Sequence, residues 1–235
     1  MNDLLTETSR FSTKVTEFLQ RITYALALTQ EQKCTIYRLR YDANLKEQTI
    51  VPNPTEMLRD RFDDAENGYN VGVCVDGRLA AALRLHLLSS DFPDSPLVHA
   101  YPDLVEPRVR AGLRIVDITR LAADFAIARS EPYLAYATVR LSMLMCQHFD
   151  ADIILAAVRR EHIPFYKREF LATQLSEPRP YPTLVKPLCL FEINFKANQY
   201  AIIGRHPFHA SSAEERANLF GPPHWPVLEH ALDIA

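Results

Sequence analysis

Glycine is scarce in this chain of 235 residues, which contains only six. A glycine-rich loop that cradles phosphate groups needs several glycines close together, so the sequence argues against such a loop. The four cysteines are scattered and form no CxxC pair, which argues against a zinc site or a disulfide framework. We interpret these cysteines as small core residues and expect no metal site.

Long apolar runs and an excess of positive charge are also missing. No apolar run approaches the roughly 20 residues that span a bilayer, and the first residues lack the apolar core of a secretion signal. The formal net charge of -3 gives no overall field that would attract nucleic acid. We therefore predict a cytoplasmic protein without a transmembrane segment and without a nucleic-acid partner.

The chain does contain enough apolar residues for a substantial core, at 48% of its composition. Periodicity and turn signals predict strands at 22–28, 69–75, 79–88, the first half of 113–128, 151–158 and a hairpin of 184–190 with 191–195. They predict helices over the first 20 residues, at 30–45 after Thr29, at 130–149 with Ser130 as N-cap, at 163–171 and after Ser212. This order predicts an α/β (α+β) fold with one mixed sheet and helices on both faces.

Two long connections separate these elements, at 46–59 and 89–112. Between the first connection and the next strand lies an acidic cluster, 60–66, for which two interpretations stay open. It is either a solvated turn or a negative patch that binds a cation, an amine or Arg40. No calcium-binding spacing and no histidine partner accompany it.

The stretch LRIVDITRLAADFAIA, 113–128, carries Asp117, Thr119 and Arg120 inside an apolar strand. Because unpaired buried charge is costly, these groups must pair or face a polar cleft. Residues three apart point to opposite faces of a regular strand, so we predict a β-bulge near Thr119 that brings Asp117 and Arg120 to one side. The alternatives are a structural ion pair at the end of a sheet and a functional site.

Several segments together resemble a known superfamily. AVRREHIPFYKREF, 157–170, resembles the fifth strand and following helix of the Gcn5-related N-acetyltransferases, with Glu169 where glycine is usual. RLRYDANLKE, DRFDDAENGY, GRLAAALRL, YPDL and VDITRLAADFAI are similar to the acyl-homoserine lactone synthases and to the long-chain N-acyl amino acid synthases. The charged positions that carry this similarity are Arg40, Asp60, Asp63 (with Asp64 as an alternative), Arg84, Asp117 and Arg120.

Two departures from these families narrow the expected acyl acceptor and the expected acyl donor. Asn44 stands where the lactone synthases have an aromatic residue of the S-adenosylmethionine pocket, and the loop after it has no tryptophan, which favours the amino-acid branch. The link ADFAIARSEP, 123–132, lacks the glycines that bind the coenzyme A pyrophosphate in ordinary acetyltransferases. An acyl group on the phosphopantetheine arm of acyl carrier protein does not need that pyrophosphate site.

The resemblance implies an acyltransferase that moves a long-chain acyl group from acyl carrier protein, or acyl-CoA, to the amine of an amino acid, with no bound cofactor. It implies catalytic roles for Asp117, Arg120, Asp60 and Asp63, and substrate-binding roles for Arg40, Arg84, Thr119 and Tyr166. Arg84 or Arg120 either binds the acceptor carboxylate or holds the aspartates, and Tyr166 either protonates the leaving thiolate or only packs. Basic residues after the fifth strand are expected to dock the acidic carrier protein: Arg159, Arg160, Lys167 and Arg168.

The expected domain limits are a helical extension at 1–21, the acyltransferase domain at 22–196 and a packed extension at 197–235. Three other functions stay open. The chain is alternatively a lactone synthase that uses S-adenosylmethionine, a conventional CoA acetyltransferase, or a non-catalytic acyl- or lipid-binding module with the same fold.

Overall fold

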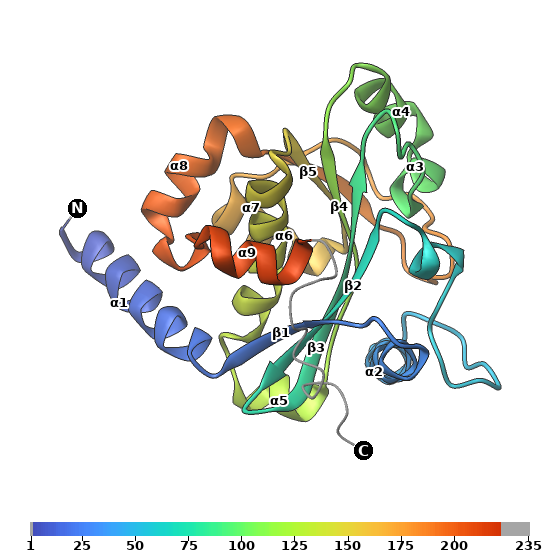
Figure 1. Ribbon diagram of the computed structural model, residues 1–235, viewed down its shortest axis with the longest axis horizontal. Coiled ribbons are helices and arrows are strands. Elements are labelled where there is room, and N and C mark those ends of the chain that lie inside the picture. The colour runs from blue at the N-terminus through green and yellow to red at the C-terminus, as the bar shows by residue number, and fades with distance from the viewer. Residues whose placement is uncertain (1, 222–235) are drawn as a thin grey trace.

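The computed structural model describes residues 2–221, and within them one seven-stranded sheet has helices on both faces (Figure 1). The strands are β1 (Ile22–Leu26), β2 (Gly68–Val75), β3 (Arg78–Leu88), β4 (Ile115–Ala123), β5 (Ile153–Val158), β6 (Thr173–Gln174) and β7 (Cys189–Asn194). Their order in the sheet is β1-β2-β3-β4-β5-β7-β6, and β4 and β5 are parallel while the other neighbours are antiparallel. The predicted mixed α/β sheet is confirmed.

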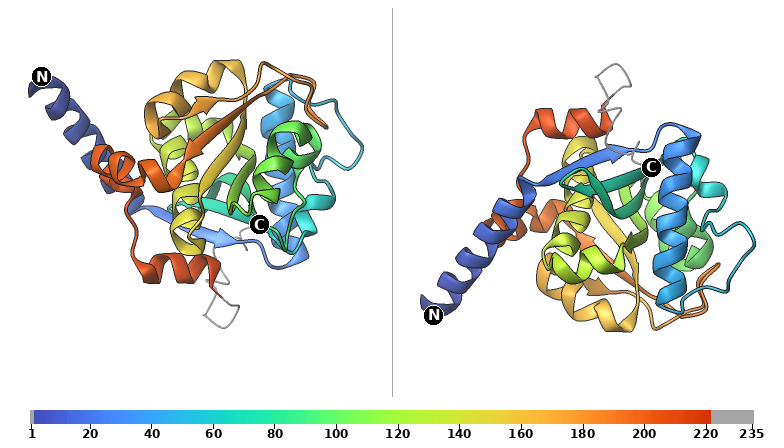
Figure 2. Two further views of the ribbon diagram at one scale, coloured as in Figure 1. Left: turned by 90° about the horizontal axis from the view of Figure 1, so that it is seen from above. Right: turned by 90° about the horizontal axis from the view of Figure 1, so that it is seen from below.

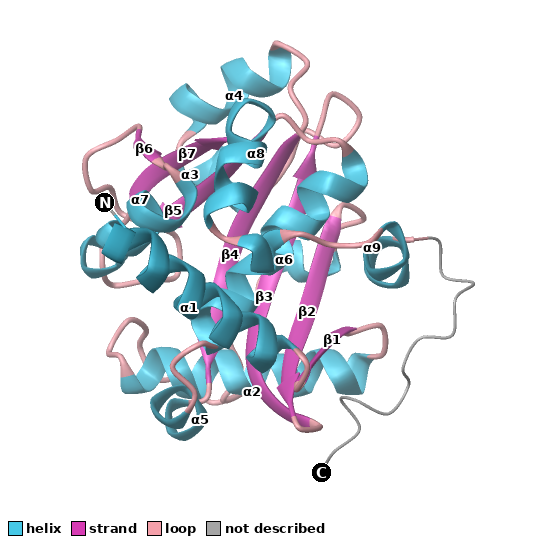
Figure 3. Ribbon diagram, turned by 90° about the vertical axis from the view of Figure 1, so that its left-hand side faces the viewer, coloured by secondary structure: helices cyan, strands magenta, loops and turns pink. Residues whose placement is uncertain are grey.

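The helices divide between the two faces of the sheet (Figures 1 and 3). One side carries α1 (Asn2–Leu19), α6 (Leu134–Phe149), α7 (Ile163–Phe170), α8 (Phe195–Arg205) and α9 (Ala213–Phe220). The other side carries α2 (Gln30–Lys46), α3 (Pro96–Ala100) and α4 (Pro102–Arg110), while α5 (Phe125–Ser130) follows the end of β4. Short 3-10 turns lie at Arg61–Asp64, Arg160–His162 and Pro207–His209.

Alternation along β3 separates an apolar face from a charged one. Leu83 and Leu85 belong to the main core that α6 covers, whereas Arg84 and His86 point to the face covered by α2. α2 begins where the sequence predicts, because the Thr29 side chain accepts a hydrogen bond from the Gln32 backbone and forms a capping box with it. The buried charge of β3 is thus held beneath α2.

The predicted helix 130–149 starts at the wrong residue. Ser130 ends the short helix α5 and is not an N-cap, and α6 begins only at Leu134. The cap of α5 is Asp124, whose side chain accepts a hydrogen bond from the Ile127 backbone. Glu131 and Pro132 break the helical run, because a residue before proline disfavours the helical conformation.

The connection 89–112 was expected to be a loop, yet it contains α3 and α4. Pro96 and Pro102 occupy the first turns of these helices, where proline has no backbone hydrogen bond to lose. Prolines therefore start these helices, and the prediction treated them as loop residues.

The predicted hairpin of 184–190 with 191–195 is wrong. Residues 184–188 are irregular, and β7 runs continuously from Cys189 to Asn194 with β6 and β5 as its neighbours. The Val185 backbone N–H donates to the Thr49 carbonyl, so this apolar segment is hydrogen-bonded to another loop and not to a neighbouring strand. α8 follows β7 directly, with Asn194 as its N-cap, and this helix was not predicted.

α1 extends away from the sheet at its N-terminal end (Figure 2). Its later part packs on the body, where the Phe11 ring contacts Tyr133 and Tyr136. Within residues 2–221, no helix combines the length and the apolar character needed to cross a bilayer. The end of the predicted C-terminal extension, 222–235, lies outside the described residues.

Candidate active site

The candidate site is built around a β-bulge in β4. Arg84 of β3 pairs with Thr119, and Ala82 pairs with Ala122, so β4 carries one residue more than β3 between these pairs. Arg120 takes the left-handed backbone conformation there, with φ of 55°. This bulge confirms the sequence-based prediction and turns Arg120 to the face that carries Asp117 and Thr119.

Three arginines and two aspartates form a buried network on that face. The Arg40 Nη1 lies 2.6 Å from Asp63 Oδ1, and Arg84 Nη1 lies 2.7 Å from Asp60 Oδ1 and 2.9 Å from Asp63 Oδ1. Arg120 Nη2 reaches Asp60 Oδ2 at 2.5 Å. Of the two interpretations of the acidic cluster, the one in which it binds Arg40 is confirmed for Asp63, whereas Asp64 and Glu66 of the same cluster are exposed.

The local fold positions each aspartate. Asp60 caps the 3-10 turn Arg61–Asp64, and Asp63 accepts the Asp60 backbone N–H, so the two carboxylates face the same way. Although burial opposes it, the guanidinium groups of Arg84 and Arg120 hold the pKa of the Asp60 carboxyl well below its usual range. Asp60 is thus ionised at neutral pH and is a poor proton acceptor.

Asn70 completes the network and was missed by the sequence analysis. Its side chain accepts a hydrogen bond from Arg40 Nη2 at 2.6 Å and donates to the Asp63 carbonyl. Asn70 is the cross-strand partner of Arg84. The signal in the sequence is a lone amide inside the otherwise apolar strand YNVGVCV, and buried amides usually have a specific partner.

Asp117 lies apart from the arginines. It is fully buried, its Oδ2 accepts a long hydrogen bond of 3.4 Å from the Leu97 backbone, and the Ser95 side chain lies near it. The family resemblance groups Asp117 with Arg40, Arg84 and Arg120, but among the described residues no cation lies within ion-pair distance of this carboxyl. Burial raises the pKa of this carboxyl to about 7.

A cavity of about 290 Å³ opens beside the bulge. The β4–β5 pairing ends at Ile118 and Ala156, and both strands continue beyond that point without pairing to each other. Thr119 and Arg120 line the cavity from β4, Val158 from β5 and Val139 from α6. The divergence of β4 and β5 thus lies next to the charged network, and the cavity there has mainly apolar walls with some polar and charged side chains.

A family model described as the N-acyl amino acid synthase FeeM matches residues 35–194, which cover β2 to β7, the bulge and the network. The chain belongs to this N-acyl amino acid synthase family. It is therefore an acyltransferase by family. None of the curated proteins compared is similar enough in sequence to count as a relative.

Solved structures share the fold of this FeeM family member at low sequence identity. FeeM itself, from uncultured soil microbes, is 12% identical with a TM-score of 0.63 over 75% of this chain and 92% of its own. The CoA-dependent acyl-homoserine lactone synthase BjaI is 15% identical with a TM-score of 0.55, over 79% and 90%. An acyl-CoA N-acyltransferase from Pseudomonas aeruginosa is 18% identical with a TM-score of 0.51, over 73% and 98%. These likenesses establish a fold of the Gcn5-related N-acetyltransferase type.

Tyr166 of this FeeM family member lines the cavity from α7. Its ring packs against Phe165 and Phe170, and burial raises the pKa of its hydroxyl to about 12. The hydroxyl therefore carries its proton at neutral pH. Both predicted roles, a proton donor to the thiolate and a packing residue, fit this position.

The predicted docking residues differ in whether their side chains already form ion pairs. Arg159 lies at the edge of the cavity and forms an ion pair of 2.7 Å with Glu47, and Arg168 pairs with Glu169 at 3.0 Å. Arg160 and Lys167 are exposed, with no ion pair to a described residue. Among residues 2–221, no three His, Cys, Asp or Glu side chains lie together as metal ligands would.

Tyr181 lines the cavity, and the sequence analysis missed it. It stands between two prolines, and its buried hydroxyl has no hydrogen-bond partner. Burial, followed by the nearby charge of Asp117, raises the pKa of this hydroxyl far above its usual value. A tyrosine in a proline-rich link gives little signal in a sequence, because such links are usually exposed.

Proposed function

We propose that this chain transfers a long-chain acyl group from acyl carrier protein to the amine of an amino acid. The observation that carries the proposal is the apolar-walled cavity at the divergence of β4 and β5, directly beside the bulge and the buried charges. A thioester placed there meets backbone groups of β4 that β5 no longer pairs. Backbone N–H groups in such positions stabilise the oxyanion of acyl transfer.

The reaction joins an ammonium group and a thioester. The nitrogen must lose one proton before it attacks the carbonyl carbon, the C–N bond forms, and the C–S bond breaks. The second nitrogen proton then neutralises the thiolate, so the products are an amide, a thiol and one released proton. Asp117 suits the first step, because a pKa of about 7 lets the carboxylate accept a proton near neutral pH. Asp117 does not line the cavity: it lies two residues before Thr119 on the same face of β4 and near the Tyr181 hydroxyl of the cavity wall, so the proton reaches it through an intervening group.

The structure favours carrier protein over free CoA as the donor. The residues that follow β4 form α5, and the Asp124 carboxylate occupies its first turn by accepting the Ile127 N–H. An additional negative group at that position disfavours a pyrophosphate. CoA remains the alternative donor, since BjaI is a CoA-dependent synthase and the neighbour from Pseudomonas aeruginosa is an acyl-CoA N-acyltransferase.

Asn44 supports an amino acid over S-adenosylmethionine as the acceptor. It lines the cavity, where its side chain donates to the Arg40 carbonyl and accepts from Thr49. The aromatic surface expected for an adenosyl group in the lactone synthases is therefore replaced by a short amide that is already hydrogen-bonded.

The deciding experiment incubates the purified chain with acyl carrier protein loaded with long-chain acyl groups and with a panel of amino acids. Mass spectrometry is expected to detect N-acyl amino acids, and parallel reactions with acyl-CoA are expected to be slower. A lactone and a released methylthioadenosine in the presence of S-adenosylmethionine would instead identify a lactone synthase. Acyl binding without any amide would identify a non-catalytic module.

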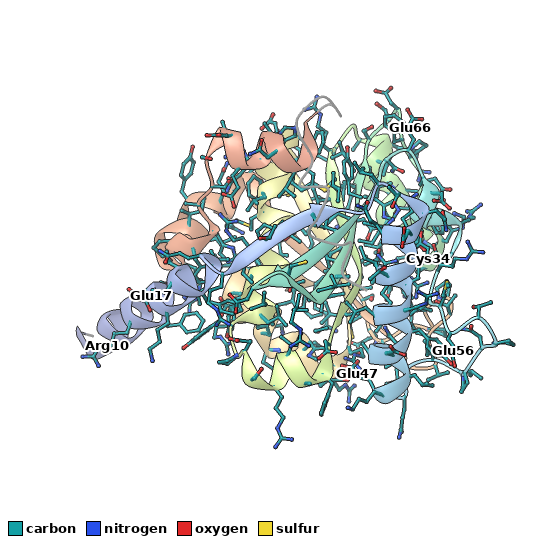
Figure 4. The ribbon with its side chains drawn as sticks, turned by 60° about the horizontal axis from the view of Figure 1, so that its bottom comes forward. Arg10, Glu17, Cys34, Glu47, Glu56 and Glu66 are labelled. Atoms are coloured by element: carbon teal, nitrogen blue, oxygen red, sulfur yellow. The ribbon has the colours of Figure 1, made fainter. Side chains whose placement is uncertain are left out.

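Reversing two exposed charges is expected to weaken use of the carrier protein. In Arg160→Glu/Lys167→Glu, the KM for acyl carrier protein should rise about 10-fold, with an unchanged KM for acyl-CoA, because rim charges steer an acidic partner. The matched control, Arg10→Glu/Lys14→Glu, changes two exposed cations of α1, on the opposite side of the molecule from Glu47 at the cavity (Figure 4). Equal KM values in both variants would contradict docking at this surface.

A further inference from the structure

Two residues of the cavity wall each carry a buried hydrogen-bond donor without a partner. One is Arg120 Nε, in a side chain that is 5% exposed, and the other is the Tyr181 hydroxyl. Buried donors in proteins are nearly always paired, so two such donors beside one cavity need an explanation. A ligand that accepts hydrogen bonds satisfies both.

The charge of the network indicates that this ligand is an anion. Arg40, Arg84 and Arg120 carry three positive charges, whereas Asp60 and Asp63 carry two negative ones. These five ion-paired groups therefore have one positive charge in excess, and the buried Asp117 carboxyl, with a pKa of about 7, balances it only when it is ionised. A cluster with an unbalanced cation next to a cavity favours a group with a single negative charge.

Only one of the three arginines is placed to meet that anion. The nitrogens of Arg84 bond to Thr119, Asp60 and Asp63, and its side chain is fully buried outside the cavity wall. Arg40 is also fully buried behind the network. Arg120 is the one that lines the cavity. The sequence left open whether Arg84 or Arg120 binds the acceptor, and access to the cavity favours Arg120.

The segment 178–188 holds Tyr181 in position beside Arg120. Arg179 forms two hydrogen bonds to the Asp103 carboxylate, at 2.7 and 3.0 Å, and the Tyr101 hydroxyl donates to the Leu188 carbonyl. Thr183 Oγ1 accepts a hydrogen bond of 2.9 Å from Arg120 Nη2. The segment is thus fixed at both ends and is joined to Arg120 in its middle, which orients both donors in advance.

We infer that Arg120 Nε and the Tyr181 hydroxyl bind the carboxylate of the amino acid acceptor. The inference rests on the proposed function, because it places that function's acceptor. A carboxylate accepts hydrogen bonds at both oxygens, so one oxygen takes the guanidinium donor and the other the phenol. The α-amine, two bonds away from the carboxylate carbon, then extends toward the gap between β4 and β5 where the thioester lies.

The test compares an amino acid with the amine that lacks only its carboxylate, both acylated from the same acyl carrier protein. In Tyr181→Phe, the KM for the amino acid is expected to rise about 10- to 100-fold, as for a lost hydrogen bond to a charged group, while the KM for the amine stays unchanged. Arg120→Lys keeps a cation near Asp60 but removes Nε, and is expected to show the same selective loss. The control Tyr166→Phe removes another cavity hydroxyl and should change both acceptors alike.

The outcomes separate the two proposals. A wild-type chain that forms no amide with either acceptor overturns the proposed function. A wild-type chain that acylates the amino acid, with a Tyr181→Phe variant that keeps the same preference for amino acid over amine, overturns the carboxylate subsite alone. Circular dichroism of each variant confirms that the fold is intact, and calorimetric titration of Arg120→Lys with the amino acid gives the same comparison without turnover.

Discussion

Replacing Asp117 by asparagine is expected to lower the kcat of amide formation about 100- to 1,000-fold, the usual contribution of a proton acceptor. The other two candidate carboxylates are unsuited to this role. Arg84 and Arg120 hold the Asp60 carboxyl ionised, and Asp63 bonds to Arg40, Arg84 and the Asp60 backbone. The measurement is single-turnover amide formation from acyl carrier protein with the wild-type chain and the variant.

The pH profile tests the same assignment. The wild-type kcat is expected to rise as the pH increases through about 7, because Asp117 accepts a proton only when it is ionised. The groups near this carboxyl are His86 on β3, Ser95 and Leu97 at α3, the Tyr181 hydroxyl, and the more distant Arg84 and Asp60. Burial lowers the pKa of His86 to about 4, so its titration falls well below this range. An unchanged rise near pH 7 in Asp117→Asn would assign the base to another group.

The same substitution is expected to stabilise the fold at neutral and alkaline pH. The Asp117 pKa is about 7 in the folded chain and 3.8 as the ordinary value, so the folded state binds more protons between these limits. Ionising the buried carboxyl therefore costs stability as the pH rises from about 4 to above 7, on the order of 4 kcal/mol in all. Urea unfolding at pH 8 should show this gain for Asp117→Asn, and the gain should vanish near pH 4.

Replacing Asp63 by asparagine is expected to lower the free energy of unfolding by about 3–5 kcal/mol, the cost of leaving a buried charge without its partner. Asp63 and Arg40 have side chains that are 1% and 0% exposed, so water cannot solvate the guanidinium in the variant. Arg84 loses one of its two carboxylates at the same time. The measurement is urea-induced unfolding followed by circular dichroism.

The neighbouring aspartate provides a matched control. Asp64 lies in the same 3-10 turn and pairs with Lys33, but its side chain is 63% exposed. Asp64→Asn is therefore expected to change the free energy of unfolding by less than about 0.5 kcal/mol. Similar losses in the two variants would mean that the buried network does not stabilise this face. The contrast also distinguishes the two aspartates that the sequence alone left as alternatives.

Local chemistry in the sequence was sufficient for several elements. Thr29 followed by Gln32 predicts the start of α2, Ser212 predicts the start of α9, and Asp76-Gly77 predicts the turn between β2 and β3. Each signal consists of neighbouring residues that bond to one another or fix a backbone angle. The secondary-structure predictions for 130–149, 89–112 and 184–195 were wrong because an apolar run or a proline is compatible with more than one kind of local structure.

The sequence by itself determined the class of fold, the family resemblance and the presence of charge in β3 and β4, because an arginine or aspartate inside an apolar strand is conspicuous wherever it folds. Only the tertiary structure decided which charges meet. Arg40, Asp60 and Arg120 lie far apart in the chain and are joined by the sheet and α2, whereas Asp117 forms no ion pair with any described residue. Tyr181 joins the site through a segment anchored on Asp103, Thr49 and Arg120. Such contacts depend on the packing of distant segments, which no local pattern encodes.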